Sequence, residues 1–281
     1  MPSSNPAPSS SSGSADAHIS ATQSLEYWNS VTPTVHGMLG GYPQVSMVDL
    51  RGSYAFFRKI QKLHPYTPPY PSDPGATVPS PSVEVVGFDT KHILDKKSEG
   101  NDTVMLGRAL DVGAGIGRVT AGFLSRICET VDIVEPIATF ASQVPAQKMT
   151  GSGTVGDVSV TGLQDWNPKP GVKYDVIWAQ WCLGHLTDTQ LVEFLKKGKG
   201  CLRRDGWIVV KENMSTDTGQ GKTATKDVYD KVDSSVTRGD ATFRRCFQEA
   251  GVRVVRSELQ RGLEKGLLPV RFYACRSEEA G

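Results

Sequence analysis

The stretch Asp111-Val112-Gly113-Ala114-Gly115-Ile116-Gly117-Arg118 decides the fold of this chain. It follows apolar residues at 109–112, which predict a buried strand, and precedes residues 118–127, which predict a helix. Its glycines let the backbone turn sharply and approach a ligand without a Cβ clash. Glu135 ends the next predicted strand, about 20 residues on, where a carboxylate can accept hydrogen bonds from ribose hydroxyls. These features together predict a nucleotide-type cofactor site in a βαβ unit.

The rest of the pattern alternates strands with helices. Apolar stretches predict strands at 130–134, 155–160, 174–179, 206–211, 252–258 and 270–276, and helical spacing predicts helices at 138–148, 188–199 and 241–250. Such alternation implies a mostly parallel sheet covered by helices on both faces, and the last two strands suggest an antiparallel edge. We therefore expect an α/β, Rossmann-like domain with a seven-stranded sheet at residues 105–281.

The residues before this domain fall into three segments. Residues 1–18 are rich in Ser and Pro and poor in apolar residues, which predicts a disordered tail. Residues 19–63 are richer in aromatic and apolar residues, and helical spacing at 52–63 predicts a helix there. Residues 64–104 begin with seven prolines in 19 residues, so we expect a Pro-rich insertion or linker, with a short edge strand at 83–88 and a polar stretch at 95–103.

Bulk composition limits the class of protein. The chain has 281 residues and a formal net charge of +1, so no overall basic excess favours binding to nucleic acid. None of the five cysteines lies in a C-x-x-C pair, and we expect reduced thiols, with neither a metal site nor a disulfide framework. We expect no secretory signal, and we find no run of about 20 apolar residues that would predict a membrane helix. We expect a monomer of the cytoplasm, the nucleus or both.

The Gly-rich turn fits two cofactors. A dinucleotide site usually reads G-x-G-x-x-G, with the pyrophosphate at the N-terminus of the helix. Here the spacing is G-x-G-x-G, followed by Arg118. S-adenosylmethionine carries a carboxylate with which Arg118 can form two parallel hydrogen bonds, although an arginine in the first turn of a helix can also be merely solvated. We favour S-adenosylmethionine and keep a nicotinamide-dependent dehydrogenase as the alternative.

Six separate stretches, in order, resemble the protein α-N-terminal methyltransferases. They are Thr32-Pro33-Thr34-Val35-His36-Gly37-Met38-Leu39-Gly40-Gly41-Tyr42, Gly113 to Arg118, Gly162-Leu163-Gln164-Asp165, Val176-Ile177-Trp178-Ala179-Gln180-Trp181, Gly184-His185-Leu186-Thr187-Asp188 and Val232-Asp233-Ser234-Ser235-Val236. Members of this family methylate the N-terminal amine of proteins that begin X-Pro-Lys once Met is removed. The resemblance covers about residues 22–63 and 107–275. It implies a class I methyltransferase fold with an N-terminal helical lid.

The resemblance also implies which residues bind S-adenosylmethionine. They are Gly113, Gly115, Arg118, Glu135, Gly162, Leu163, Gln164 and Gln180. Leu163 can pack on the adenine, and Gln164 or its backbone can bind the adenine edge, although Leu163 also suits ordinary core packing. Gln180 follows the predicted strand at 174–179, at the end of the sheet where open α/β folds bind ligands.

The chemistry of the acceptor requires a base. A free α-amine has a pKa of about 7.7–8.0, so it is largely protonated at neutral pH and must lose a proton before it attacks a methyl group. The resemblance assigns this task to His185 and Asp233, and it implies that the carboxamide of Asn213 binds the substrate backbone. Taken alone, His185 also suits a cap or core position, and Asp233 suits a helix N-cap.

Further residues are implied in substrate binding. The flat face of Trp181 would pack on the proline ring, and Asp230 with Ser235 would bind the lysine at the third position. Asp230 lies three residues before Asp233, and we expect both carboxylates on one face of a helical turn. Trp28, Leu39 and Gly40 belong to the lid segment, which would cover the substrate channel and exclude water.

The chain departs from the family pattern in four places. The Pro-rich segment is longer than usual, and about ten extra residues at 216–225 separate Asn213 from Asp230. Leu268 stands where the family often has an aromatic residue lining the channel, which puts fine substrate preference in doubt. Glu135 stands where the best-known members have Asp.

We therefore expect methylation of X-Pro-Lys N-termini, up to di- or trimethylation. The alternative is an S-adenosylmethionine-dependent methyltransferase of another small-molecule or protein amine. A methyltransferase acting on RNA is disfavoured because Asp230 and Asp233 would repel phosphate. A non-catalytic scaffold is disfavoured by the intact set of candidate site residues.

Overall fold

A computed structural model describes residues 14–63, 105–215 and 226–278 of the chain. The first thirteen residues of the expected tail and the Pro-rich segment at 64–104, with the strand expected at 83–88 and the polar stretch at 95–103, lie outside the described residues. So does the extra segment at 216–225.

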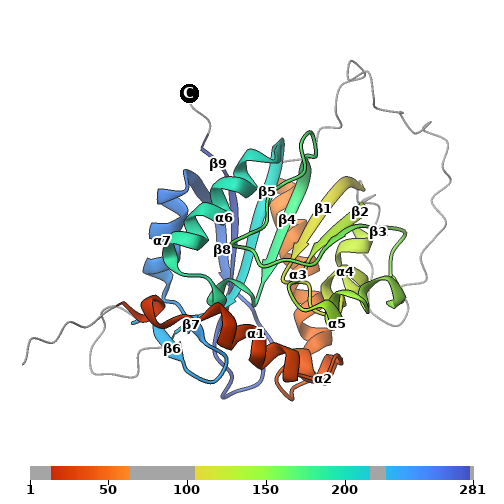
Figure 1. The fold of residues 1–281 in the computed structure, drawn as a ribbon. Helices are drawn as coiled ribbons and strands as arrows, with labels where there is room; N and C mark the ends of the chain where they lie inside the picture. The colour runs from red at the N-terminus through yellow and green to blue at the C-terminus, as the bar shows by residue number, and fades with distance from the viewer. Residues whose placement is uncertain (1–13, 64–104, 216–225, 279–281) are drawn as a thin grey trace, which may run out of the picture.

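A seven-stranded sheet forms the centre of the molecule, in the order β3-β2-β1-β4-β5-β9-β8 (Figure 1). Its strands are β1 (Leu106–Val112), β2 (Cys128–Val134), β3 (Thr154–Ser159), β4 (Tyr174–Gln180), β5 (Leu202–Asn213), β8 (Val252–Leu259) and β9 (Val270–Ser277). The first five pair in parallel, whereas β9 is antiparallel to both β5 and β8. The expected mostly parallel sheet with an antiparallel pair at one edge is confirmed.

Helices cover both faces of the sheet (Figure 1). They are α3 (Val45–Leu63), α4 (Arg118–Gly122), α5 (Ala138–Ala141), α6 (Asp188–Gly200) and α7 (Asp240–Glu249), with 3-10 turns η2 (Leu124–Arg126), η3 (Val144–Ala146) and η4 (Leu183–His185). On one face, Phe56 of α3 stacks on Phe272 of β9 at 4.5 Å between ring centroids. On the other, Phe243 and Phe247 of α7 pack against Tyr273.

Two predicted helices are shorter than expected. The helix expected at 118–127 ends at Gly122, and the chain resumes as η2. A Cβ on Gly122 would lie 2.5 Å from a methyl of Leu50 on α3, so this position requires glycine. The helix expected at 138–148 ends at Ala141, and Pro145, which cannot donate the backbone hydrogen bond of a continuing α-helix, lies within the tighter η3. In contrast, α3 starts at Val45, before the expected residue 52.

The N-terminal segment lies across the end of the sheet where β1, β2, β4 and β5 end (Figure 1). It contains η1 (Ala15–His18), α1 (Ala21–Ser30) and α2 (Val35–Met38) and contacts a hairpin of β6 (Val228–Asp230) and β7 (Ser235–Thr237). The prediction of disorder is wrong for residues 14–18. Asp16 accepts a hydrogen bond of 2.8 Å from the backbone of Asp188, and the ring of His18 packs on Tyr229, so this part is held in place.

In the part of the chain that the structure describes, no helix has the length and apolar character needed to cross a membrane.

Candidate functional site: two adjoining cavities

The Gly-rich turn between β1 and α4 has the backbone shape that the sequence suggests. Gly113, Gly115 and Gly117 adopt φ angles of +63°, +57° and +83°, in the left-handed region that side chains disfavour. A Cβ on Gly113 would lie 2.3 Å from the Cβ of Cys182, and one on Gly115 would lie 2.9 Å from the sulfur of Met38. The glycines therefore form a cradle that any larger residue would fill.

Glu135 joins the end of β2 to this turn. Its Oε2 accepts a hydrogen bond of 2.7 Å from the N–H of Gly115, and its Oε1 accepts one of 2.9 Å from the N–H of Ile137. Burial raises the pKa of Glu135, and the two backbone donors act in the opposite direction. Each carboxylate oxygen has two lone-pair sites, so Glu135 keeps acceptor capacity for further donors.

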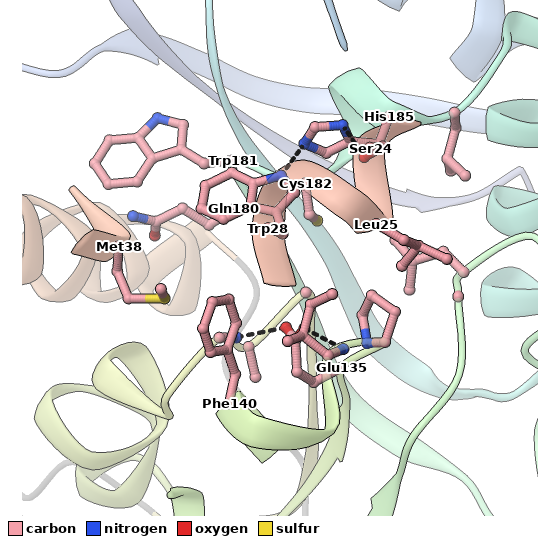
Figure 2. Close-up of a pocket in the computed structure, with 18 of the residues that line it drawn as sticks. Ser24, Leu25, Trp28, Met38, Glu135, Phe140, Gln180, Trp181, Cys182 and His185 are labelled. Atoms are coloured by element: carbon pink, nitrogen blue, oxygen red, sulfur yellow. Dashed lines mark hydrogen bonds between the residues drawn. The ribbon is translucent and has the colours of Figure 1, made fainter. Parts of the chain in front are cut away.

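A first cavity of about 270 Å³ lies above the turn (Figure 2). All eight residues predicted to bind the cofactor line it: Gly113, Gly115, Arg118, Glu135, Gly162, Leu163, Gln164 and Gln180. Met38, Phe140 and Cys182, which sequence reasoning missed, complete much of its apolar wall. The sequence gives little signal for these three, because they are apolar residues like many in the core.

Asp49 of α3 is the principal residue that sequence reasoning missed. Fully buried, it accepts hydrogen bonds of 2.7 Å from Arg118 and 2.9 Å from Gln180, and it forms an ion pair with the buried ammonium of Lys211. Arg118, predicted to pair with a ligand carboxylate, thus also has a partner within the protein. The available signal was a charged residue at helical spacing on the apolar stripe that includes Phe56.

The charged groups of this cluster shift one another's pKa values. Burial raises the pKa of Asp49, but the charges of Lys211 and Arg118 outweigh burial, so the net shift is downward. Burial lowers the pKa of Lys211 to about 8, against the attraction of Asp49. The carboxylate is therefore held ionised between two cations.

A second cavity of about 480 Å³ adjoins the first. It is lined by the predicted residues Trp28, Leu39, Gly40, Trp181, His185, Asn213, Asp233 and Ser235, and also by Leu268. Four residues line both cavities: Trp28, Met38, Trp181 and His185. The two cavities thus share a wall made by the lid helices and the residues that follow β4.

His185 lies at this shared wall and is hydrogen-bonded at both ring nitrogens (Figure 2). Its Nδ1 is 2.8 Å from the hydroxyl of Ser24, and its Nε2 accepts a hydrogen bond of 3.0 Å from the indole N–H of Trp28. Burial lowers the pKa of His185, while the Asp233 carboxylate and the Ser234 backbone act to raise it. Both partners on α1 are outside the six stretches that carry the resemblance.

Asp233 lies in the turn of the β6–β7 hairpin, and the expected helical turn is wrong. Ser234 adopts a φ of +55°, which no helix contains, and Asp233 Oδ1 accepts a hydrogen bond of 3.1 Å from the N–H of Ser235. Asp230 is exposed and does not line the second cavity; its Oδ1 accepts from the N–H of Val232. It pairs directly opposite Ser235, which places both side chains on one face of the hairpin.

Two further features of the second cavity were not expected. The carboxylate of Glu212 accepts hydrogen bonds of 2.8 and 2.9 Å from the N–H groups of Cys182 and Leu183, which fixes the start of η4 and hence His185. Burial raises the pKa of Glu212 to about 7. Trp181 adopts a φ of +54°, uncommon for a bulky residue, and its buried indole N–H has no hydrogen-bond partner.

Within the described ranges, no group of three or more His, Cys, Asp or Glu side chains is placed to hold a metal ion.

Comparison with known proteins identifies the family. The model of the AdoMet-dependent proline di-methyltransferases matches residues 16–68 and 82–276. The chain belongs to this family. The unmatched residues between the two parts fall inside the Pro-rich segment.

Similar curated proteins carry consistent names. The chain is 33% identical over 255 residues to N-terminal Xaa-Pro-Lys N-methyltransferase 1 of Danio rerio, and the match covers 91% of this chain and 94% of that protein. It is 34% identical over 255 residues to alpha N-terminal protein methyltransferase 1 of Schizosaccharomyces pombe, covering 90% and 94%. The Arabidopsis thaliana protein of the same name is 33% identical over 254 residues, covering 89% and 77%.

A solved structure supports the fold and the cofactor. A SAM-dependent methyltransferase from Leishmania major is 31% identical, with a TM-score of 0.68, and the match covers 91% of this chain and 82% of that one. The family member described here is therefore an S-adenosylmethionine-dependent methyltransferase.

The first cavity fits this cofactor. Glu135 offers a carboxylate for ribose hydroxyls, and Leu163 and Phe140 offer apolar surface for an adenine. The Gly113–Gly115 cradle leaves room that a Cβ would fill. These observations support the assignment independently of the comparisons.

Proposed function

We propose that the protein transfers methyl groups from S-adenosylmethionine to the α-amine of proteins that begin X-Pro-Lys. The observation that carries this proposal is the shared wall of the two cavities. The first cavity contains all of the predicted cofactor ligands, and the second contains Trp181, His185, Asn213 and Asp233. A donor in one cavity and an amine in the other would meet at Trp181 and His185. The names of the Danio rerio and other relatives support the same substrate class.

In the first cavity, the residues of the chain would bind and orient S-adenosylmethionine. Glu135 would accept hydrogen bonds from the ribose, Leu163 and Gln164 would contact the adenine, and Arg118 with Gln180 would bind the methionine end. When bound, S-adenosylmethionine supplies an electrophilic methyl group on a sulfonium. Asp49 keeps Arg118 and Gln180 in place, since both donate to its buried carboxylate.

On the acceptor side, the residues would hold the substrate N-terminus and remove its proton. Asn213 would bond the peptide backbone, and Trp181 would pack on the proline ring. The carboxylate of Asp233 and the imidazole of His185 are the candidate bases, because an α-ammonium must become neutral before it can attack.

Specificity for lysine would come from the hairpin. Asp230 and Ser235 pair directly across β6–β7; Ser235 lines the second cavity, and Asp230 is exposed. An exposed carboxylate attracts a lysine ammonium weakly, by about 0.2–1 kcal/mol. This residue would therefore tune affinity for the peptide more than the rate of transfer.

The lid would exclude water from the reaction. Trp28, Leu39 and Gly40 line the second cavity, and Trp28 also lines the first. A closed, dry site strengthens the electrostatic interactions within it. We expect successive transfers, up to di- or trimethylation, and the family description names dimethylation.

A panel of peptides tests the proposal. We expect kcat/KM to be highest for X-Pro-Lys and to fall when alanine replaces the proline or glutamine replaces the lysine. Free small-molecule amines should be poor substrates. A small-molecule amine methylated more efficiently than any Pro-second peptide would favour the alternative acceptor and overturn the proposal.

A further inference from the structure

Helix α1 buries a polar side chain, that of Ser24, against the rest of the protein. Ser24 is the one buried residue among the ten of α1, whereas the large apolar Leu25 beside it is 38% exposed. An amphipathic surface helix normally buries apolar residues on its inner face. A buried hydroxyl needs a hydrogen-bond partner, and that of Ser24 is 2.8 Å from Nδ1 of His185.

The partners of His185 determine where its ring proton lies. An indole N–H can only donate, so Nε2 of His185, 3.0 Å from Trp28 Nε1, must be an unprotonated acceptor. A neutral imidazole then carries its proton on Nδ1, which faces the hydroxyl oxygen of Ser24. Figure 2 shows the ring between these two side chains of α1.

We propose that Trp28 and Ser24 are positioning residues that hold His185 neutral, with its proton on Nδ1. This inference rests on the proposed function, because it concerns which candidate base is available to the substrate. With α1 docked, neither nitrogen of His185 has a free lone pair. Asp233 is then the acceptor: a proton leaves the substrate ammonium, its N–H electron pair remains on nitrogen, and an O–H bond forms on Asp233.

The docking of α1 is tied to Asp233. The backbone N–H of Ser20 donates to the hydroxyl of Ser234 at 2.8 Å, and the side chain of Gln23 donates to the carbonyl of Lys231 at 2.6 Å. Both acceptors belong to the hairpin turn that contains Asp233. Helix α1 and its N-cap residue Ser20 therefore hydrogen-bond both to the ring of His185 and to the turn that contains Asp233.

The groups facing His185 act on its protonation in opposite directions. Burial and the Trp28 donor favour the neutral ring. The Asp233 carboxylate, the Ser234 backbone and the oxygen of Ser24 favour the charged ring. Removing Trp28 and removing Ser24 should therefore shift the pKa of His185 in opposite directions.

Nitrogen NMR of the full-length, ¹⁵N-labelled protein without substrate tests this proposal. Long-range ¹H–¹⁵N spectra distinguish protonated from unprotonated ring nitrogens, and His185→Gln assigns the signals among the five histidines. We expect a protonated Nδ1 and a bare Nε2 at neutral pH. Trp28→Phe should raise the pKa of His185 by about one unit, and Ser24→Ala should lower it by a similar amount, as the loss of single hydrogen bonds predicts.

Matched variants separate this effect from general loosening. Ser24→Thr keeps the hydroxyl and should keep the wild-type pKa, as should Ser30→Ala, which removes an exposed hydroxyl of the same helix. A proton on Nε2, or an imidazolium at neutral pH, would overturn the proposal. An upward shift of the pKa of His185 in both Trp28→Phe and Ser24→Ala would also overturn the proposal, because water entering the site would raise this pKa in either variant.

Kinetics give a second readout. Ser24→Ala should lower kcat, and Ser24→Thr, which keeps the hydroxyl, should restore it. If no X-Pro-Lys peptide is methylated but the NMR results hold, the proposed function fails and the assignment of the His185 tautomer stands. If kcat is unchanged in Ser24→Ala, the positioning role is contradicted.

Discussion

Asp49 Oδ2 accepts a hydrogen bond of 2.7 Å from Nη1 of Arg118, so that helix α3 holds the arginine at the end of the cofactor turn. The same carboxylate contacts Gln180 and Lys211. It links the lid segment, the turn after β1 and the ends of β4 and β5. We regard Asp49 as the residue through which the lid orders the cofactor cavity.

Removing this carboxylate should be costly. Asp49→Asn leaves the buried Lys211 ammonium and the Arg118 guanidinium without an anion, which typically destabilises a protein by about 3–5 kcal/mol. We expect that loss in urea denaturation, together with weaker S-adenosylhomocysteine binding by calorimetry. The double variant Asp49→Asn/Lys211→Met should recover part of the stability, because one buried charge is gone. No recovery would show that the charge of Lys211 is not the cause.

The glycines of the turn should differ in how far alanine substitution destabilises the protein. Gly113→Ala combines a strained φ with a Cβ 2.3 Å from that of Cys182, and should cost about 2–5 kcal/mol of unfolding free energy. Gly115→Ala meets only the flexible end of Met38 and should cost less. Gly171→Ala, with a φ of +78° and open space around it, is the control for strain alone. Equal losses of unfolding free energy in all three variants, measured by urea denaturation, would contradict the role given to close packing around Gly113 and Gly115.

Stability should depend on pH through Glu212. Burial raises its pKa to about 7 from an ordinary value of 4.5, so between these values the folded state binds more protons than the unfolded state. The free energy of unfolding therefore falls as pH rises through this window. From pH 4.5 to 8 the wild type should lose about 3 kcal/mol more than Glu212→Gln.

Urea denaturation at the two pH values measures this difference. Asp111, whose pKa burial also raises to about 7, is present in both proteins and cancels. Glu249→Gln, at a half-exposed position, should keep the wild-type slope. An equal change in the free energy of unfolding between the two pH values for wild type and Glu212→Gln would refute the raised pKa of Glu212.

The two hairpin carboxylates should have separable effects. Asp233→Asn removes the proposed proton acceptor and should lower kcat about a hundredfold to ten-thousandfold, while S-adenosylhomocysteine affinity stays unchanged because Asp233 does not line the first cavity. Asp230→Asn should mainly raise KM for a Lys-bearing peptide, by about two- to fivefold. Steady-state kinetics on one peptide compares them. A large loss of kcat in Asp230→Asn alone would reverse these roles.

Local sequence signals were sufficient for the sheet and the cofactor turn. Apolar stretches predict β1 to β5, and glycines at 113, 115 and 117 adopt the φ angles that the turn requires. All eight predicted cofactor residues line one cavity because each lies at the end of a strand at the same edge of the sheet, in the segment that follows such a strand, or at the start of α4.

What the sequence did not predict depends on long-range contacts. Asp49 meets Lys211 across 162 positions of chain, and Ser24 meets His185 across 161, which no local periodicity encodes. The hairpin at Asp233 was mistaken for a helical turn because a spacing of three residues suits both, and the left-handed Ser234 has no distinctive signal. Pro145 did carry such a signal, since proline is disfavoured inside a helix and the helix predicted at 138–148 ends before it, at Ala141.

The central claim is most directly tested by mass spectrometry of an X-Pro-Lys peptide incubated with the enzyme and S-adenosylmethionine, alongside the same peptide with its α-amine acetylated. We predict one or more methyl groups on the N-terminal nitrogen of the free peptide, located by fragmentation, and none on the acetylated peptide. Methylation of the lysine side chain in both peptides, or no methylation of either, would contradict the account.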